Sequence, residues 1–92
     1  MTVLDNATID AALEQLEWER EGDEIVRKFD CGTFPKALEF VNAVGERAEA
    51  ANHHPDIDIR WKDVALRLST HSAGGLTQKD LDLATEINQI AG

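Results

Sequence analysis

The sequence predicts an α+β domain in which three helices pack on one face of a four-stranded antiparallel sheet, in the order α-β-β-α-β-β-α. Apolar residues recur at helical spacing in three segments, whereas the two segments between them alternate apolar with polar residues and contain short turn signals. Hairpins between helices are typical of an antiparallel sheet with its helices gathered on one side. The 92 residues have the length of one domain, which we place at residues 1–92.

The first helix is expected over residues 8–16, because apolar residues fall at i, i+4 and i+7 starting from Ile9. Asn6 or Thr8 could cap its start. A hairpin is expected next, because the turn-like Glu21-Gly22-Asp23 precedes a run in which apolar and polar residues roughly alternate.

A longer second helix is expected to begin at Phe34 with Thr33 as its cap. Pro55 disfavours helical geometry at the residue before it, so this helix must end near Asn52 or His53. Its apolar stripe is expected to contain the following residues at helical spacing: Phe34, Ala37, Leu38, Val41, Val44, Ala48 and Ala51.

The second hairpin gives the clearest strand pattern in the chain. Ile57, Ile59 and Trp61 alternate with charged residues, which predicts that all three face the core and gives Trp61 a packing role. A turn at Lys62-Asp63 leads into a second alternating run, and by parity His71 lies on the polar face at its end.

The third helix has a strong start signal after a glycine-containing loop. Thr77 is expected to cap it, Asp80 to complete a capping box as the third helical residue, and Leu76 to pack against Leu81 as a hydrophobic staple.

Charge and composition limit the classes of partner. Eighteen acidic residues against nine basic ones give a formal charge of −9, which disfavours direct binding to nucleic acid or anionic lipid. No apolar run approaches the roughly 18 residues that a membrane span needs, and residues 1–5 do not resemble a signal peptide, so we expect a cytoplasmic protein. Cys31 is the single cysteine, so an intrachain disulfide is not expected.

Three histidines could carry acid–base chemistry, because imidazole is the side chain that ordinarily titrates near neutral pH. His53 and His54 are adjacent at a helix end, and His71 comes from another element. Glu49 precedes His53 by four residues and is expected to orient its ring. The same residues also allow simpler interpretations: a helix stop at the two histidines, a solvated loop residue at His71, and a purely capping role for Asp80. A metal site is disfavoured, because adjacent histidines do not readily point at one ion.

The run from Glu49 to Asp80 resembles the pterin-4a-carbinolamine dehydratase family. The family motif begins with an acidic or basic residue, followed by any three residues and then a His. The next position is His or Asn, and the one after it is Pro, Cys or Ser. Glu49 through Pro55 match this pattern here. It continues at three positions that this sequence matches: Trp61, His71 and Asp80. A Trp just before the first hairpin, here Trp18, is also typical, and the resemblance covers roughly residues 16–91.

The resemblance implies a hydro-lyase that dehydrates 4a-hydroxytetrahydropterin to quinonoid dihydropterin without a metal or organic cofactor. It implies that His54 and His71 transfer protons at the 4a-hydroxyl and N5, and that His53 lies in the same pocket. Glu49 and Asp80 would be supporting residues, with Asp80 acting electrostatically or through His71.

For the substrate, the resemblance and the flat shape of a pterin suggest stacking on Trp18 or Trp61, although the core-face parity of Trp61 favours its packing role. They also suggest hydrogen bonds from the turn that begins at Ser72. Family members pair as homodimers or homotetramers through sheet edges and helices, and an open-edged sheet gives this chain a reason to do the same. The alternative function is a non-catalytic interaction module acting as a dimerisation cofactor or assembly factor. The complete set of histidines favours the enzyme.

Overall fold

The computed structural model describes residues 2–92, and their elements follow the predicted order. The helices of these residues are α1 (Asn6–Leu16), α2 (Phe34–Ala51), α3 (Gln78–Ala91) and a short 3-10 helix, η1 (His71–Ala73). The strands are β1 (Glu19–Glu21), β2 (Glu24–Asp30), β3 (Asp56–Arg60) and β4 (Asp63–Leu68). They form an antiparallel sheet in the order β1-β2-β4-β3, so the predicted fold class is confirmed.

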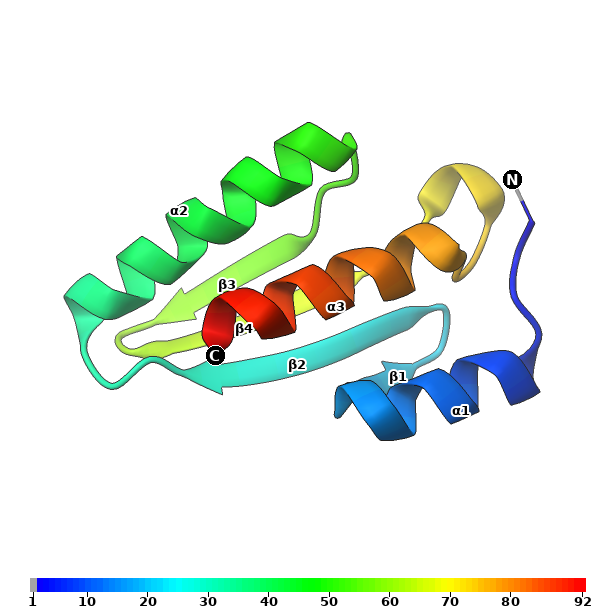
Figure 1. The fold of residues 1–92 in the computed structure, drawn as a ribbon, viewed down its shortest axis with the longest axis horizontal. Coiled ribbons are helices and arrows are strands. Elements are labelled where there is room, and N and C mark those ends of the chain that lie inside the picture. The colour runs from blue at the N-terminus through cyan, green and yellow to red at the C-terminus, as the bar shows by residue number, and fades with distance from the viewer. Residues whose placement is uncertain (1) are drawn as a thin grey trace.

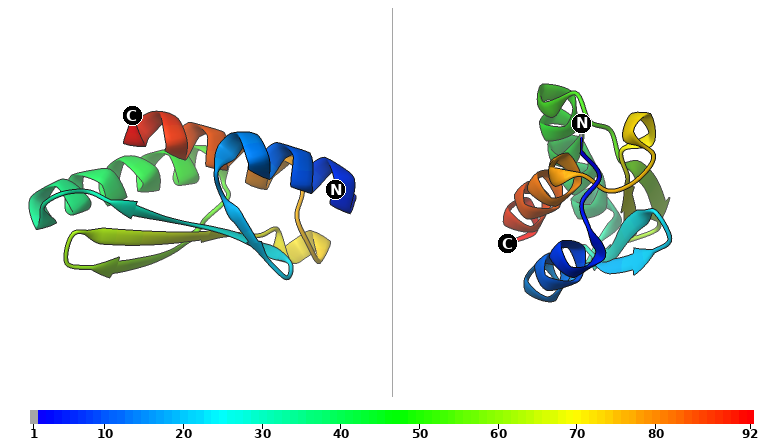
Figure 2. Two further views of the ribbon diagram at one scale, coloured as in Figure 1. Left: turned by 90° about the horizontal axis from the view of Figure 1, so that it is seen from below. Right: turned by 90° about the vertical axis from the view of Figure 1, so that its right-hand side faces the viewer.

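The α-helices lie on one face of the sheet and leave the other face open (Figures 1 and 2). The core lies between these layers, where Ile25 and Leu66 from the sheet and Val44 and Ile87 from the helices have no exposed surface. Within residues 2–92 no helix is both long and apolar enough to cross a membrane.

Helix α1 begins two residues earlier than expected, and its cap is Asp5 instead of Asn6 or Thr8. Asp5 has extended backbone angles, and its Oδ1 accepts the backbone N–H of Thr8 at 2.8 Å. A carboxylate in that position satisfies one of the free N–H groups at a helix start.

Helix α2 has the predicted bounds and cap, but its buried face is rotated from the predicted one. Phe34 and Leu38, expected in the core, are 47% and 41% exposed, and Ala51 is also exposed. The buried side chains are Ala37, Phe40, Val44 and Ala48. Phe40 belongs to the buried face because its ring packs against the ring of Phe29 on β2, with the ring centroids 5.0 Å apart.

The hairpin of β3 and β4 turns one residue earlier than expected. Arg60 pairs with Asp63, so Trp61 and Lys62 form the turn, and Trp61 adopts a positive φ of 55°. The predicted packing role of Trp61 is therefore wrong: its side chain stands at the hairpin tip and is 70% exposed. Ile57 and Ile59 keep the predicted parity, but β3 is an edge strand and all of its residues are exposed.

Candidate active site

The first part of the site lies where α2 ends. Asn52 adopts a left-handed conformation (φ 50°, ψ 43°), and its N–H bonds back to the carbonyls of Ala48 and Glu49. The N–H of His53 donates to the Ala48 carbonyl at 3.0 Å. This turn stops the helix and directs the His53 side chain toward α3, where only 10% of it remains exposed.

His53 bonds to a fully buried carboxylate. Its Nε2 lies 2.6 Å from Oδ1 of Asp80, which is in the first turn of α3 and has no exposed surface. Oδ2 of the same carboxylate accepts the backbone N–H of Thr77 at 2.9 Å, as part of the predicted capping box. Asp80 can thus cap α3 and contact a site histidine at the same time. The histidine that it contacts is His53, whereas the sequence suggested His71.

Two threonines complete this buried cluster: sequence reasoning placed Thr77 there as the cap but missed the contacts of Thr70. Thr70 Oγ1 lies 2.7 Å from Asp80 Oδ2 and 2.8 Å from Thr77 Oγ1. Among residues 2–92 no buried side-chain nitrogen or oxygen lacks a hydrogen-bond partner. The parity of β4 could have revealed Thr70, because it continues the core-facing series of Leu66 and Leu68 and a polar residue there needs a partner.

Glu49 bonds to His54, not to His53 as we expected. Its Oε1 lies 2.8 Å from His54 Nε2, and both side chains are exposed, 82% for Glu49 and 58% for His54. The four-residue rule for helical neighbours fails here because α2 ends at Ala51, before either histidine. After the turn at Asn52, His53 points inward and His54 folds back over the last turn of α2.

His71 begins η1, three residues after β4 ends at Leu68, and its side chain is exposed. Its Nε2 lies 3.3 Å from Ser69 Oγ. Because Asp56 pairs with Arg67 in antiparallel strands, the segment that enters β3 and the segment that leaves β4 lie at the same end of the hairpin. The α2–β3 connection and η1 lie near each other in Figure 1 and in the right-hand view of Figure 2.

The two remaining site candidates lie in different surroundings. Ser72 is exposed within η1, next to His71. Trp18 is in the core, 3% exposed, with its ring edge-on to Phe29 and its Nε1–H donating to Asn88 Oδ1 at 2.8 Å. This burial argues against the expected stacking of a ligand on Trp18.

The carboxylate partners determine which ring nitrogens carry protons. An ionised carboxylate only accepts hydrogen bonds, so Nε2–H of His53 donates to Asp80 and Nε2–H of His54 donates to Glu49. We therefore assign the lone pair of each neutral ring to Nδ1. The His54 ring is 58% exposed, and Nδ1 is the ring nitrogen that the bond to Glu49 leaves free.

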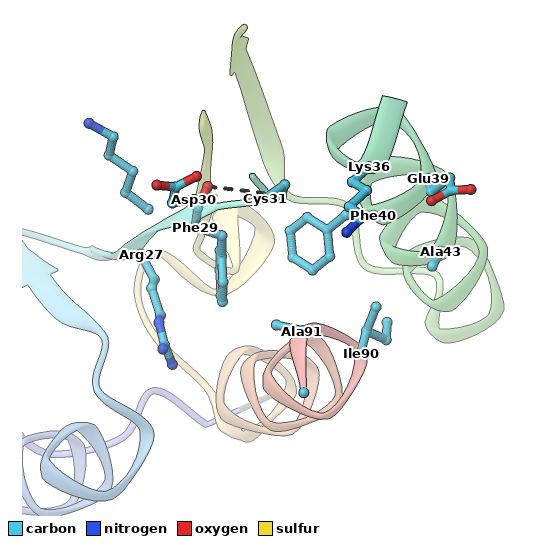
Figure 3. Close-up of a pocket in the computed structure, with 12 residues that line it drawn as sticks. Arg27, Phe29, Asp30, Cys31, Lys36, Glu39, Phe40, Ala43, Ile90 and Ala91 are labelled. Carbon is cyan, nitrogen blue, oxygen red and sulfur yellow. Dashed lines mark hydrogen bonds between the residues drawn. The ribbon is translucent and has the colours of Figure 1, made fainter. Parts of the chain in front are cut away.

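Hollows in the surface lie on both sides of the molecule. One of about 410 Å³ is next to His53 and is lined by charged residues of α3, among them Lys79, Asp82 and Glu86. Another, of about 610 Å³, lies at the opposite end between β2, α2 and α3, and Phe29 and Phe40 are among the residues that line it (Figure 3). No histidine lines this second hollow. Within residues 2–92 no group of three or more His, Cys, Asp or Glu side chains is placed to hold a metal ion.

Comparison with known proteins gives one consistent result. The family model described as "Pterin 4 alpha carbinolamine dehydratase" matches residues 2–90. A relative from Roseiflexus sp. (strain RS-1), named "Putative pterin-4-alpha-carbinolamine dehydratase", is 56% identical over 90 residues, covering 97% of each chain. A relative of the same name from Nocardia farcinica is 52% identical over 90 residues, covering 97% of this chain and 95% of its own.

Solved structures give the same result for the fold. A "transcriptional coactivator/pterin dehydratase" from Brucella melitensis superimposes with a TM-score of 0.94 at 31% identity, covering 99% of this chain and all of the other. A "pterin dehydratase-like protein" described as a RuBisCO assembly factor in the alpha-carboxysome matches with a TM-score of 0.67 at 18% identity, covering 82% of this chain and 87% of its own, and so shares the fold.

Proposed function

The chain belongs to the pterin-4a-carbinolamine dehydratase family, and we propose that it dehydrates a 4a-hydroxytetrahydropterin to the quinonoid dihydropterin by histidine general acid–base catalysis. The reaction needs two proton transfers. The C4a–O bond breaks as an acid protonates the hydroxyl, which leaves as water, and a base takes the proton from N5 as the C4a–N5 double bond forms. Two positioned imidazoles can supply both steps.

One observation carries this proposal: histidines from two separate segments lie at one end of the β3–β4 hairpin, and two of them are oriented by carboxylates. We propose that His54 and His71, whose side chains are exposed, make the proton transfers at the 4a-hydroxyl and N5. His53 is largely buried, so within the same pocket it supports the site through its bond to Asp80. Glu49 orients His54, and a carboxylate beside an imidazole stabilises the positive charge that forms when the ring takes up a proton.

The substrate contacts in the proposal come from η1. Ser72 is exposed beside His71 and offers a hydroxyl and a backbone amide, groups that can bond to the polar edge of a pterin. Trp18 is left out because its ring is covered and its N–H is bonded. Trp61 stands at the far end of β3 from His54, so within one chain it lies away from the histidines.

The decisive experiment measures dehydration of a 4a-hydroxytetrahydropterin by absorbance, with the purified protein and with buffer alone. The proposal expects acceleration, and His54→Ala and His71→Ala should each lose about 10²–10⁴-fold in rate, the usual contribution of one positioned acid or base. Glu46→Gln is the control, because Glu46 is exposed on α2 one turn before Glu49 and has no part in the site. If the wild-type protein gave no acceleration, or a folded histidine variant kept full activity, the proposed catalysis would be wrong.

The proposal includes a homodimer or homotetramer. Strand β3 has a free edge, and Ile57 and Ile59 are 38% and 37% exposed along it. If two copies of β3 pair about a two-fold axis at Ile59, Asp58 of each copy faces Arg60 of the other, so opposite charges flank an apolar centre. Sedimentation of a single monomeric species at micromolar concentration would contradict this part.

A second candidate function is a non-catalytic interaction module. The observation that favours it is the exposure of large apolar side chains beyond the β3 edge, notably Phe34 and Leu38 on α2. The Brucella neighbour is described as a coactivator as well as a dehydratase, so the two roles are compatible in one fold. Absence of dehydratase activity together with a stable oligomer would favour this second candidate.

A further inference from the structure

Thr70 connects the two segments that carry the histidines. It is 4% exposed, lies two residues after the end of β4 and comes directly before His71. Its backbone holds the η1 turn in place, since its N–H donates to the Gly75 carbonyl at 3.1 Å and its carbonyl accepts the Ala73 N–H at 3.0 Å. Its side chain bonds to Asp80, on the first turn of α3. One residue thus anchors both the loop of His71 and the carboxylate that contacts His53.

The hydrogen bonds around Thr70 have a definite direction. Asp80 Oδ2 can only accept, so Thr70 uses its single hydroxyl proton to donate to it, at 2.7 Å. The 2.8 Å bond between the two threonine hydroxyls must then run from Thr77 to Thr70. The Thr77 backbone N–H also donates to Oδ2, at 2.9 Å. The Thr70 hydroxyl and the Thr77 N–H therefore donate to the carboxylate directly, and the Thr77 hydroxyl donates to Thr70.

Two donors on Oδ2 hold the plane of the Asp80 carboxylate, and this leaves Oδ1 directed at His53 Nε2, 2.6 Å away. Without the Thr70 hydroxyl, the carboxylate would keep one neutral donor on Oδ2 and could turn about its last side-chain bond. Because the His53 ring is held by Oδ1, its orientation and the location of its proton depend on that plane.

We infer that Thr70 is a positioning residue: its hydroxyl, oriented by Thr77, fixes the Asp80 carboxylate so that His53 keeps its proton on Nε2 and its lone pair on Nδ1. The kinetic consequence rests on the proposed dehydratase function. Thr70 does not touch the substrate in this scheme, so it affects the rate of the chemical step through His53 and leaves substrate binding largely intact.

The test compares Thr70→Val, which removes the hydroxyl at constant shape, with Thr70→Ser, which restores it. Thr85→Val is the control, because it removes a hydroxyl from α3 that bonds to the Leu81 carbonyl, outside the cluster. Two quantities are measured on each folded protein. The first is kcat and KM for the pterin. The second is the pair of ¹⁵N shifts of the His53 ring, taken at a pH where the ring is neutral, which report the nitrogen that carries the proton.

We expect Thr70→Val to lower kcat by about tenfold, the effect typical of removing a group that orients a site residue, with KM little changed. Its His53 shifts should move toward a mixture of the two protonated forms, and Thr70→Ser should restore both the shifts and most of kcat. Any one of three results for Thr70→Val overturns the inference. These are a wild-type kcat, wild-type His53 shifts, or losses equal to those of Thr85→Val. If wild-type protein were inactive, the dehydratase proposal would fail, and the ring shifts of the resting protein would still decide the positioning role.

Discussion

Replacing Asp80 with asparagine tests the buried cluster most directly. Three donors converge on this carboxylate: His53 Nε2–H at 2.6 Å, the Thr70 hydroxyl at 2.7 Å and the Thr77 N–H at 2.9 Å. An amide has one oxygen, and two of the donors meet at Oδ2, so in Asp80→Asn the amide oxygen would stay there and the NH₂ group would face His53. The His53 proton would then have to leave Nε2 for Nδ1, and a charge-assisted bond would become a neutral one.

The expected cost follows from that exchange. Hydrogen bonds to charged groups contribute about 1.5–3 kcal/mol, against about 1 kcal/mol for neutral ones. Weakening all three bonds, and losing the preferred protonated nitrogen of His53, should therefore lower the free energy of unfolding by about 2–3 kcal/mol. For a domain of this size that corresponds to a Tm lower by roughly 8–20 °C. Asp80→Ala should cost more, because it leaves three buried donors unpaired.

Urea denaturation followed by circular dichroism measures these differences. Asp82→Asn is the matched control, because Asp82 is exposed on the same helix and bonds only to Gln78 Nε2, at 2.9 Å. It should change the free energy of unfolding by less than about 0.5 kcal/mol. An Asp80→Asn protein as stable as the Asp82→Asn control would refute the view that this carboxylate is ionised and accepts all three bonds.

Three further outcomes are expected. Glu49→Gln should lower kcat by up to about tenfold, because it removes the charge that orients His54, while the free energy of unfolding stays close to that of the Glu46→Gln control. Equal rates in the two variants would contradict the assignment of Glu49. Ile59→Lys should shift the sedimentation coefficient from oligomer to monomer, because a charge on the free edge of β3 opposes strand pairing; an unchanged coefficient would place the interface elsewhere. Burial, helped by the negative charges of Asp30 and Asp63, raises the pKa of Cys31. Iodoacetamide should therefore alkylate the folded protein more slowly than the unfolded chain at the same pH, and equal rates would show that the thiol is not shielded.

The sequence was sufficient for most of the fold because its signals are local. Thr33 caps α2, Thr77 and Asp80 form their capping box, and the alternation of β4 sets its inward and outward faces. Each of these depends on residues a few positions apart. The rotation of α2 could not be predicted in this way, because it depends on Phe40 meeting Phe29, which lies on another element.

The candidate site was predicted at the level of residues but not of partners. Sequence reasoning selected His53 and Glu49 as a pair from helical spacing, and the structure breaks that pair because the helix ends first. The partner of His53 is Asp80, 27 residues away, and helical spacing carries no information at that separation. Trp18 shows the same limit, since only the packing of β2 and α3 around it reveals that it is enclosed.

The pairing of β3 with β4 has a consequence for the precision of the site. Val64, Leu66 and Leu68 are fully buried on one side of β4. Sliding β4 by one residue would turn all three outward, at a cost of about 1.5–3 kcal/mol each, or roughly 5–9 kcal/mol in total. No such slip is tolerated in a domain whose whole stability is about 5–15 kcal/mol. The spacing between the segments of His54 and His71 is therefore enforced by leucines and a valine in the core.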